Sequence, residues 1–176
     1  MRTIFDKETE GGMQNALHLV TWKLPDKQFV LELPEGFAEI DEEKKEENYP
    51  LSDRPEIILE DEQGEVQLTL QFFYKVMKTD ETKGVTEQIH ELMENTYVQY
   101  PSSQVYLDKN GEIPIGWFLM RMSDLKKEHI KAVFSIKRHM ALLTLTYPEE
   151  ESWKWRAIKD YIFISIKEES NGTGYE

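Results

Sequence analysis

Histidine and carboxylate side chains are the groups in this sequence that could carry chemistry. The four histidines, His18, His90, His129 and His139, stand far apart, and none belongs to an HExxH or H-x-H pattern that would pair two metal ligands. His90 and Glu91 are adjacent in an expected helix, where neighbours i and i+1 do not share a face. We therefore expect structural or solvated histidines.

Two acidic stretches resemble the start of a calcium-binding loop: DEQGE from Asp61 and DKNGE from Asp108. Such a loop requires a bidentate glutamate at its twelfth position. Phe72 and Leu119 occupy those positions here, so we interpret both stretches as hairpin turns.

The sequence offers no other recognisable reaction centre. No serine lies in a Gly-x-Ser-x-Gly context, and there is no glycine-rich phosphate loop. We predict no catalytic residue, no cofactor and no metal site. Carboxylates are so plentiful that a small carboxylate- or histidine-dependent hydrolase stays open as the less favoured alternative.

Composition excludes several classes of function. The 176 residues include no cysteine, which excludes disulfides, thiolate catalysis and cysteine-ligated metals. The formal net charge is −13 and the sequence pI about 4.8, so neither nucleic acid nor an anionic membrane is an expected partner. No apolar run approaches the roughly 20 residues needed to span a bilayer, and the N-terminus does not resemble a signal peptide. We expect a cytoplasmic protein, unless a leader was removed.

Acidic residues concentrate in one segment. Residues 35–47 carry seven carboxylates against two lysines. We interpret this segment as a solvated loop, and a docking site for a basic partner is the alternative.

The hydrophobic pattern predicts a single α+β domain with an antiparallel sheet of about six to eight strands and two main helices packed on it. We expect a flexible N-terminal arm (1–16), the folded domain (17–166) with an acidic loop (38–55), and a disordered tail (167–176). Expected strands are 17–24, 29–37, 56–61, 65–76, 103–108, 112–122, 129–136 and 140–147. Expected helices are 84–100, which has an apolar stripe of period 3.6, and roughly 149–166, which follows Pro148.

Alternation along the strands predicts two different sheet faces. The core face, expected to lie beneath both helices, comprises Val66, Leu68, Leu70, Phe72, Ile115, Trp117, Leu119, Ile130, Ala132, Phe134, Ile136, Ala141, Leu143 and Leu145. The second face mixes polar and apolar groups and is rich in methionine, a residue common on adaptable binding surfaces. It comprises Gln67, Thr69, Gln71, Phe73, Phe118, Met120, Met122, Val133, Ser135, Met140, Leu142 and Thr144.

Two interpretations of the second face remain open. Either the N-terminal arm or the acidic loop folds over it, or it is exposed for a partner or for a second copy of the chain. The candidate partner surface consists of Phe73, Phe118, Met120, Met122, Met140 and Leu142.

The order of elements resembles the PsbP-like superfamily over about residues 17–166. The resemblance rests on FVLELPEGF, then GEVQLTLQFF, a helix ending in YP, two hairpins, and the closing stretch MALLTLTYPEEESWKWRAIKDYIFISI. That fold is shared by the photosystem II extrinsic protein, a yeast Ran-binding import factor and small bacterial proteins of the DcrB type. The acidic insertion at 38–55 and the N-terminal arm depart from the pattern.

The resemblance implies an antiparallel sheet with packed helices and a domain that binds rather than catalyses. One bacterial branch is similar to adaptor chaperones of type VI secretion, which hold apolar helices against the sheet. The family has no fixed site residues to carry over. The leading hypothesis is therefore a noncatalytic adaptor or chaperone that binds an apolar, helical protein segment on the second face. A homodimer that buries this face against itself is the alternative.

Overall fold

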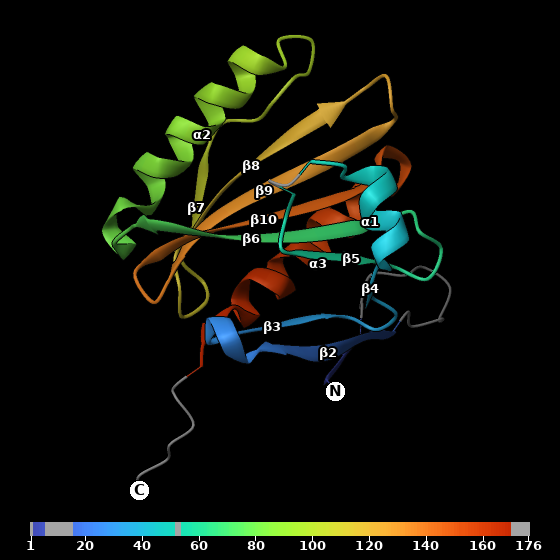
Figure 1. Ribbon diagram of the computed structural model, residues 1–176, viewed down its shortest axis with the longest axis horizontal. Coiled ribbons are helices and arrows are strands. Elements are labelled where there is room, and N and C mark those ends of the chain that lie inside the picture. The colour runs from blue at the N-terminus through green and yellow to red at the C-terminus, as the bar shows by residue number, and fades with distance from the viewer. Residues whose placement is uncertain (1, 6–15, 52–53, 170–176) are drawn as a thin grey trace, which may run out of the picture.

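The computed structural model describes residues 2–5, 16–51 and 54–169. Their strands build a large antiparallel sheet of order β4-β5-β6-β10-β9-β8-β7 and a small one of order β1-β2-β3-β11 (Figure 1). The strands are β1 (Arg2–Phe5), β2 (Ala16–Leu24), β3 (Phe29–Pro34), β4 (Ala38–Glu39), β5 (Ile57–Glu60), β6 (Gln67–Val76), β7 (Tyr106–Asp108), β8 (Ile115–Met122), β9 (Lys127–Ile136), β10 (His139–Pro148) and β11 (Lys167–Glu168). The α-helices are α1 (Glu42–Asn48), α2 (Thr82–Thr96) and α3 (Ser152–Ser165). The predicted α+β class with an antiparallel sheet is confirmed.

The predicted core face forms as expected. Its residues are buried or half-buried in one cluster, because cross-strand partners on neighbouring strands point to the same side. Leu70 on β6 lies opposite Leu143 on β10, which lies opposite Ala132 on β9. Ala132 in turn lies opposite Trp117 on β8.

Helix α3 and strand β3 cover the core face together. Trp155, Ile158 and Ile162 on α3 join the same cluster as Phe29 and Leu31 on β3. Phe29 stacks on Phe134 of the large sheet, with ring centroids 5.7 Å apart. The N-terminal hairpin was expected as part of one sheet. Instead β2 and β3 form a separate small sheet, which β11 extends by pairing with β3.

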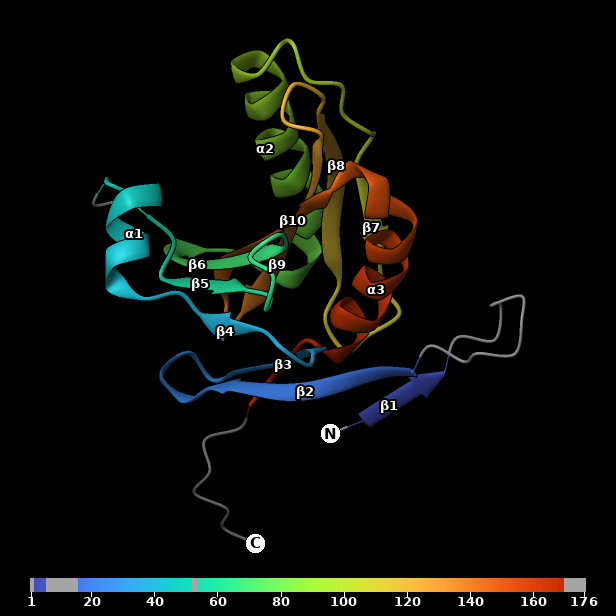
Figure 2. The same cartoon turned by 90° about the vertical axis from the view of Figure 1, so that its right-hand side faces the viewer.

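Helix α2 lies on the opposite side of the large sheet, over β8 and β9, which corrects the expectation that both helices cover the core face. Figure 2 shows α1 and α2 on one side of this sheet and α3 on the other. Val85 packs with Met77, Val133 and Met140 in a second buried cluster. A Cβ at Gly116 would lie 2.0 Å from the Thr86 hydroxyl oxygen, so only glycine allows α2 to approach β8 this closely.

The acidic loop contains a short helix that the hydrophobic pattern did not predict. The Asp41 carboxylate caps α1 by accepting a hydrogen bond from the Lys44 backbone N–H at 2.8 Å. Glu42 and Glu43 occupy the first turn, where the helix dipole favours acidic side chains. The helix is polar on all sides and buries none of its residues, which is why no apolar period marks it.

The N-terminal arm and the C-terminal tail, which were expected to be flexible and disordered, each contain a short strand. Arg2–Phe5 pairs with β2, and Lys167–Glu168 pairs with β3. The remainder of the N-terminal arm, residues 6–15, and residues 170–176 of the tail lie outside the described residues. None of the helices that the structure describes is long and apolar enough to cross a bilayer.

Candidate functional site

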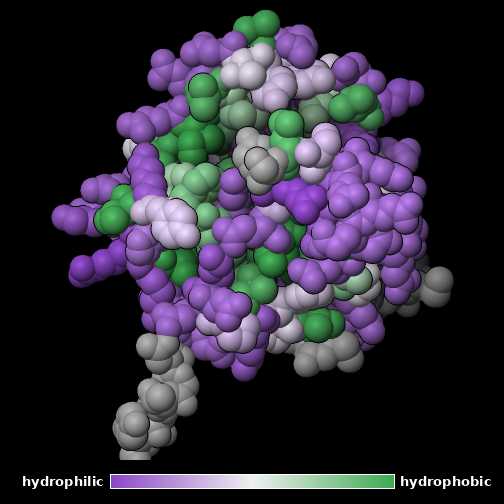
Figure 3. Space-filling model, in the orientation of Figure 1, coloured by the Kyte–Doolittle hydropathy of each residue, from purple (hydrophilic) through white to green (hydrophobic). Residues whose placement is uncertain are grey.

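Helix α2 divides the second face of the large sheet into two halves. Over β8 and β9, Phe118, Met120 and Val133 are completely buried. Over β6 and β10, the second-face side chains from Gln67 to Phe73 and from Leu142 to Thr146 stay half-buried, whereas that of Met140 is buried. We name this half, together with Lys131 on β9, the open strip. Its members are Gln67, Thr69, Gln71, Phe73, Lys131, Leu142, Thr144 and Thr146. Figure 3 shows this face, on which hydrophobic and hydrophilic residues are mixed.

The structure separates the six predicted surface residues. Phe118 and Met120 are 0% exposed and Met140 is 8% exposed, so the expectation of one accessible methionine-rich surface was wrong for these three. They are buried because α2 packs on this face and brings the His90 ring against Phe118, with ring centroids 4.9 Å apart.

The other three predicted residues remain half-buried. Phe73 and Leu142 belong to the open strip, whereas Met122 ends β8. The acidic segment covers one margin of the face, where the Tyr49 hydroxyl donates a hydrogen bond to Gln67. The described part of the N-terminal arm pairs with β2 in the other sheet.

Lys131 supplies the positive charge of the open strip. Its ammonium donates a hydrogen bond to the Thr144 hydroxyl at 3.1 Å, directly across the β9–β10 pair. No carboxylate lies within ion-pair distance of it among the described residues. Burial lowers the pKa of the Lys131 amine to about 8, because partial removal from water disfavours its charged form.

His129 precedes Lys131 by two residues and points to the same side of the sheet. Its side chain is 8% exposed, and its buried Nε2 has no hydrogen-bond partner in the described part of the chain. Burial, and secondly the charge of Lys131, lower the pKa of His129 to about 3. The imidazole is therefore neutral at physiological pH and adds no second positive charge beside Lys131.

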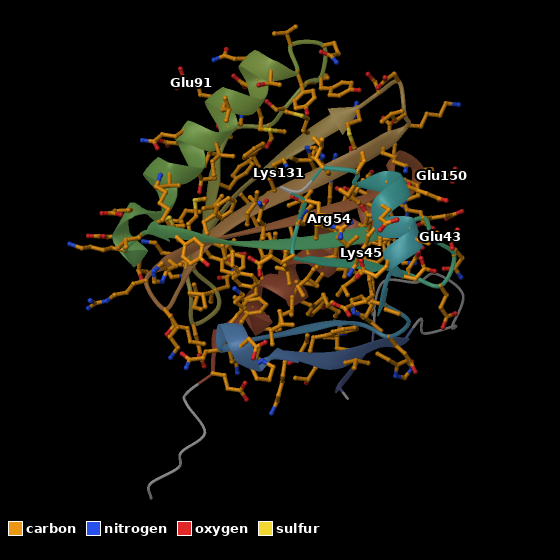
Figure 4. All side chains as sticks on the ribbon, viewed as in Figure 1. Glu43, Lys45, Arg54, Glu91, Lys131 and Glu150 are labelled. Atoms are coloured by element: carbon orange, nitrogen blue, oxygen red, sulfur yellow. The ribbon has the colours of Figure 1, made fainter. Side chains whose placement is uncertain are left out.

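Two further cations border the open strip. Lys45 on α1 and Arg54 in the following loop both contact Glu42, at 3.4 Å and 3.5 Å. The Glu42 side chain is 74% exposed, so water screens both contacts. Figure 4 labels Lys131 on the sheet and Lys45 and Arg54 on the α1 side of it, with Glu43, Glu91 and Glu150 nearer the margins of the view.

A histidine–serine–glutamate cluster links α2 to the edge of β8 and has the composition of a hydrolase triad. His90 Nε2 lies 3.2 Å from the Ser102 hydroxyl, which donates to Glu94 at 2.9 Å. However, Nε2 also lies 2.7 Å from the carbonyl oxygen of Ser103, so this nitrogen carries the hydrogen. It cannot then act as a base toward Ser102, and Glu94 contacts the same nitrogen instead of Nδ1. The geometry is that of a structural link.

A second charged cluster lies at the end of the core. The Glu128 side chain is completely buried and accepts hydrogen bonds from the Tyr147 hydroxyl at 3.0 Å and from Arg156 at 2.8 Å. Arg121 lies 3.5 Å away. Burial and the Glu128 charge raise the pKa of the Tyr147 hydroxyl. The Glu128 carboxylate is paired with all three of these side chains, which come from β8, β10 and α3. The cluster therefore links these elements to β9 and has the character of a structural contact.

The described residues include no group of three or more histidine, aspartate or glutamate side chains arranged to hold a metal ion. The histidines that the sequence singled out lie in separate places. His90 is on α2, His129 on β9, and His139 begins β10. His18 lies on β2 of the small sheet.

Comparisons with known proteins identify the fold. No protein-family model and no curated protein matches this sequence. The solution structure of cyanobacterial PsbP (CyanoP) from Synechocystis sp. PCC 6803 is similar, with a TM-score of 0.60 at 10% sequence identity. The match covers 92% of this chain and 98% of the cyanobacterial chain. The resemblance that the sequence indicated is thus confirmed at the level of structure: this chain has a PsbP-like fold.

Proposed function

We propose that this chain is a noncatalytic protein-binding module that holds a peptide segment of its partner on the open strip. The uneven cover of the second face supports the proposal. One half is sealed by α2, while the other half leaves a row of half-buried side chains without a covering helix. The PsbP-like fold is compatible with this role.

An adaptor or chaperone role is the form of this proposal that the surface favours. Phe73 and Leu142 give the open strip an apolar part. An apolar side chain of a bound segment could be covered by these two residues. The polar remainder of the strip would hydrogen-bond to the backbone or side chains of that segment.

The test compares four versions of the protein in a pull-down from the native host. Wild type is compared with Leu142→Asp and Gln71→Glu, each of which places a negative charge on the open strip. Leu125→Asp is the matched control, because Leu125 is 57% exposed in the turn between β8 and β9. We exclude Met120→Asp as a probe because Met120 is 0% exposed, and a charge there would unfold the protein.

We expect both strip variants to lose a protein that wild type and the control capture, while all four keep the same circular dichroism spectrum. The captured protein is then purified and its affinity measured directly. Equal affinity of folded Leu142→Asp and wild type would refute the proposal. The homodimer alternative predicts a solution mass of twice 20.8 kDa that falls to 20.8 kDa in the strip variants.

A further inference from the structure

We propose that Lys131 is the anchor for a carboxylate in the bound segment, so that the open strip selects peptides with an acidic side chain close to an apolar one. This inference rests on the proposed function and names the chemistry of the partner.

Among the described residues, no side chain next to Lys131 along β9 or across its neighbouring strands carries a negative charge. The cross-strand neighbours of Lys131 are Thr144 on β10 and Phe118 on β8, and its neighbours along the same face of β9 are His129 and Val133. An ammonium group has three donors, and within the described part of the chain Lys131 uses one of them, in its bond to Thr144. A partly buried charge without a counter-ion is costly. A ligand carboxylate at this position would supply both the missing charge and the missing acceptors.

The unpartnered nitrogen of His129 is a second, independent sign that this part of the sheet is incomplete. Its Nε2 is buried and lacks a partner among the described residues. His129 and Lys131 are thus neighbours on one face of β9. Within the described part of the chain, the first has an imidazole nitrogen without a hydrogen-bond partner and the second an ammonium group without a counter-ion.

The charge of the chain limits what the ligand can be. Lys45 and Arg54 are already paired with Glu42, so Lys131 is the cation that a ligand on the open strip would meet. The whole chain carries −13, so a long polyanion such as nucleic acid would be repelled. A peptide with one or a few carboxylates could pair with Lys131 and would experience much less repulsion from the rest of the chain.

The apolar part of the strip fixes the spacing in the peptide. Leu142 lies two residues before Thr144, the hydrogen-bond partner of Lys131, which corresponds to about 7 Å along β10. Side chains that far apart are i and i+2 of an extended peptide, or about one turn apart on a helix. The segment is therefore expected to carry an aspartate or glutamate at one of these spacings from a large apolar residue.

The experiment is a selection from a phage-displayed library of random dodecapeptides against purified full-length protein. Wild type, Lys131→Met, Lys131→Arg and Leu142→Asp are used in parallel, with Lys127→Met as a matched control at an exposed position on the same strand. Thermal unfolding verifies that each variant is folded. We expect wild type, Lys131→Arg and the control to enrich acid-plus-apolar peptides, and Lys131→Met to lose the acidic preference.

Affinity measurements on one selected peptide complete the test. Replacing its acidic residue by the matching amide should weaken binding to wild type about tenfold or more, and should leave binding to Lys131→Met unchanged. Peptides that bind independently of the acid but fail with Leu142→Asp would overturn this inference and leave the proposed function intact. Peptides unaffected by either variant, or no enrichment at all, would overturn both.

Discussion

The buried imidazole of His129, whose Nε2 has no hydrogen-bond partner among the described residues, makes the stability of the fold depend on acidity. The unfolded chain binds a proton at this histidine near pH 6.5, its ordinary pKa, whereas the folded protein binds it only near pH 3. Between these values the unfolded state holds more protons, so lowering the pH favours unfolding. The free energy of unfolding falls by about 1.4 kcal/mol per pH unit within that window.

The prediction is a difference between wild type and His129→Leu. From pH 7 to pH 5 the wild type should lose about 2 kcal/mol more than the variant, and by pH 4 about 3 kcal/mol more. Any packing effect of the substitution adds a constant offset, because leucine does not titrate. The carboxylates of the chain contribute equally to both proteins, so the difference isolates His129.

The assay is urea unfolding at pH 7, 6, 5 and 4, followed by tryptophan fluorescence. His139→Leu is the control, because His139 is exposed at the start of β10. Its stability should follow that of wild type across the series. If the stabilities of wild type and His129→Leu run parallel between pH 7 and pH 4, the reasoning about the buried imidazole is wrong.

Three further predictions concern other parts of the molecule. Glu128→Gln should cost about 2 kcal/mol in urea unfolding, because it removes charge-assisted hydrogen bonds to a buried carboxylate, and a loss below 0.5 kcal/mol, roughly the scatter for surface changes, would contradict this. Gly116→Ala should cost about 1–3 kcal/mol and speed hydrogen exchange in α2, whereas Gly84→Ala, which has open space around it, should stabilise by about 0.5–1 kcal/mol. The Lys131 pKa of about 8 means that wild type should gain stability relative to Lys131→Met as pH rises from 8 to 10.5, and a flat difference in calorimetry would refute this.

The core face could be predicted from the sequence because strand alternation is a local property. Side chains alternate between the two faces of a sheet, so the sequence of a strand assigns each residue to one face. On β10 this alternation predicted that Ala141, Leu143 and Leu145 share the core face, as they do. The same reasoning identified the hairpin at 137–139. There Lys137 and Arg138 both adopt positive φ, as a two-residue hairpin turn requires.

The position of α2 could not be predicted in this way. An apolar stripe shows that a helix has a face to bury, but not which side of the sheet receives it. The available signal was Gly116, a glycine within a strand of large side chains, which indicates close approach of another element, here Thr86 on α2. His129 and Lys131 lie on β9, against which α2 packs, so their burial depends on tertiary contacts that periodicity does not encode.

The pairing of β11 with β3 has a consequence for the way this protein is made. The Glu32 backbone N–H on β3 donates to the hydroxyl of Ser165, which follows it by 133 residues. At ordinary rates of translation, a ribosome needs about 7 to 27 seconds to add that many residues. During this interval the apolar side of β3, with Phe29, Leu31 and Leu33, lacks its cover from α3. Every newly synthesised molecule therefore passes through a period in which the apolar side of its N-terminal hairpin has no α3 to pack against.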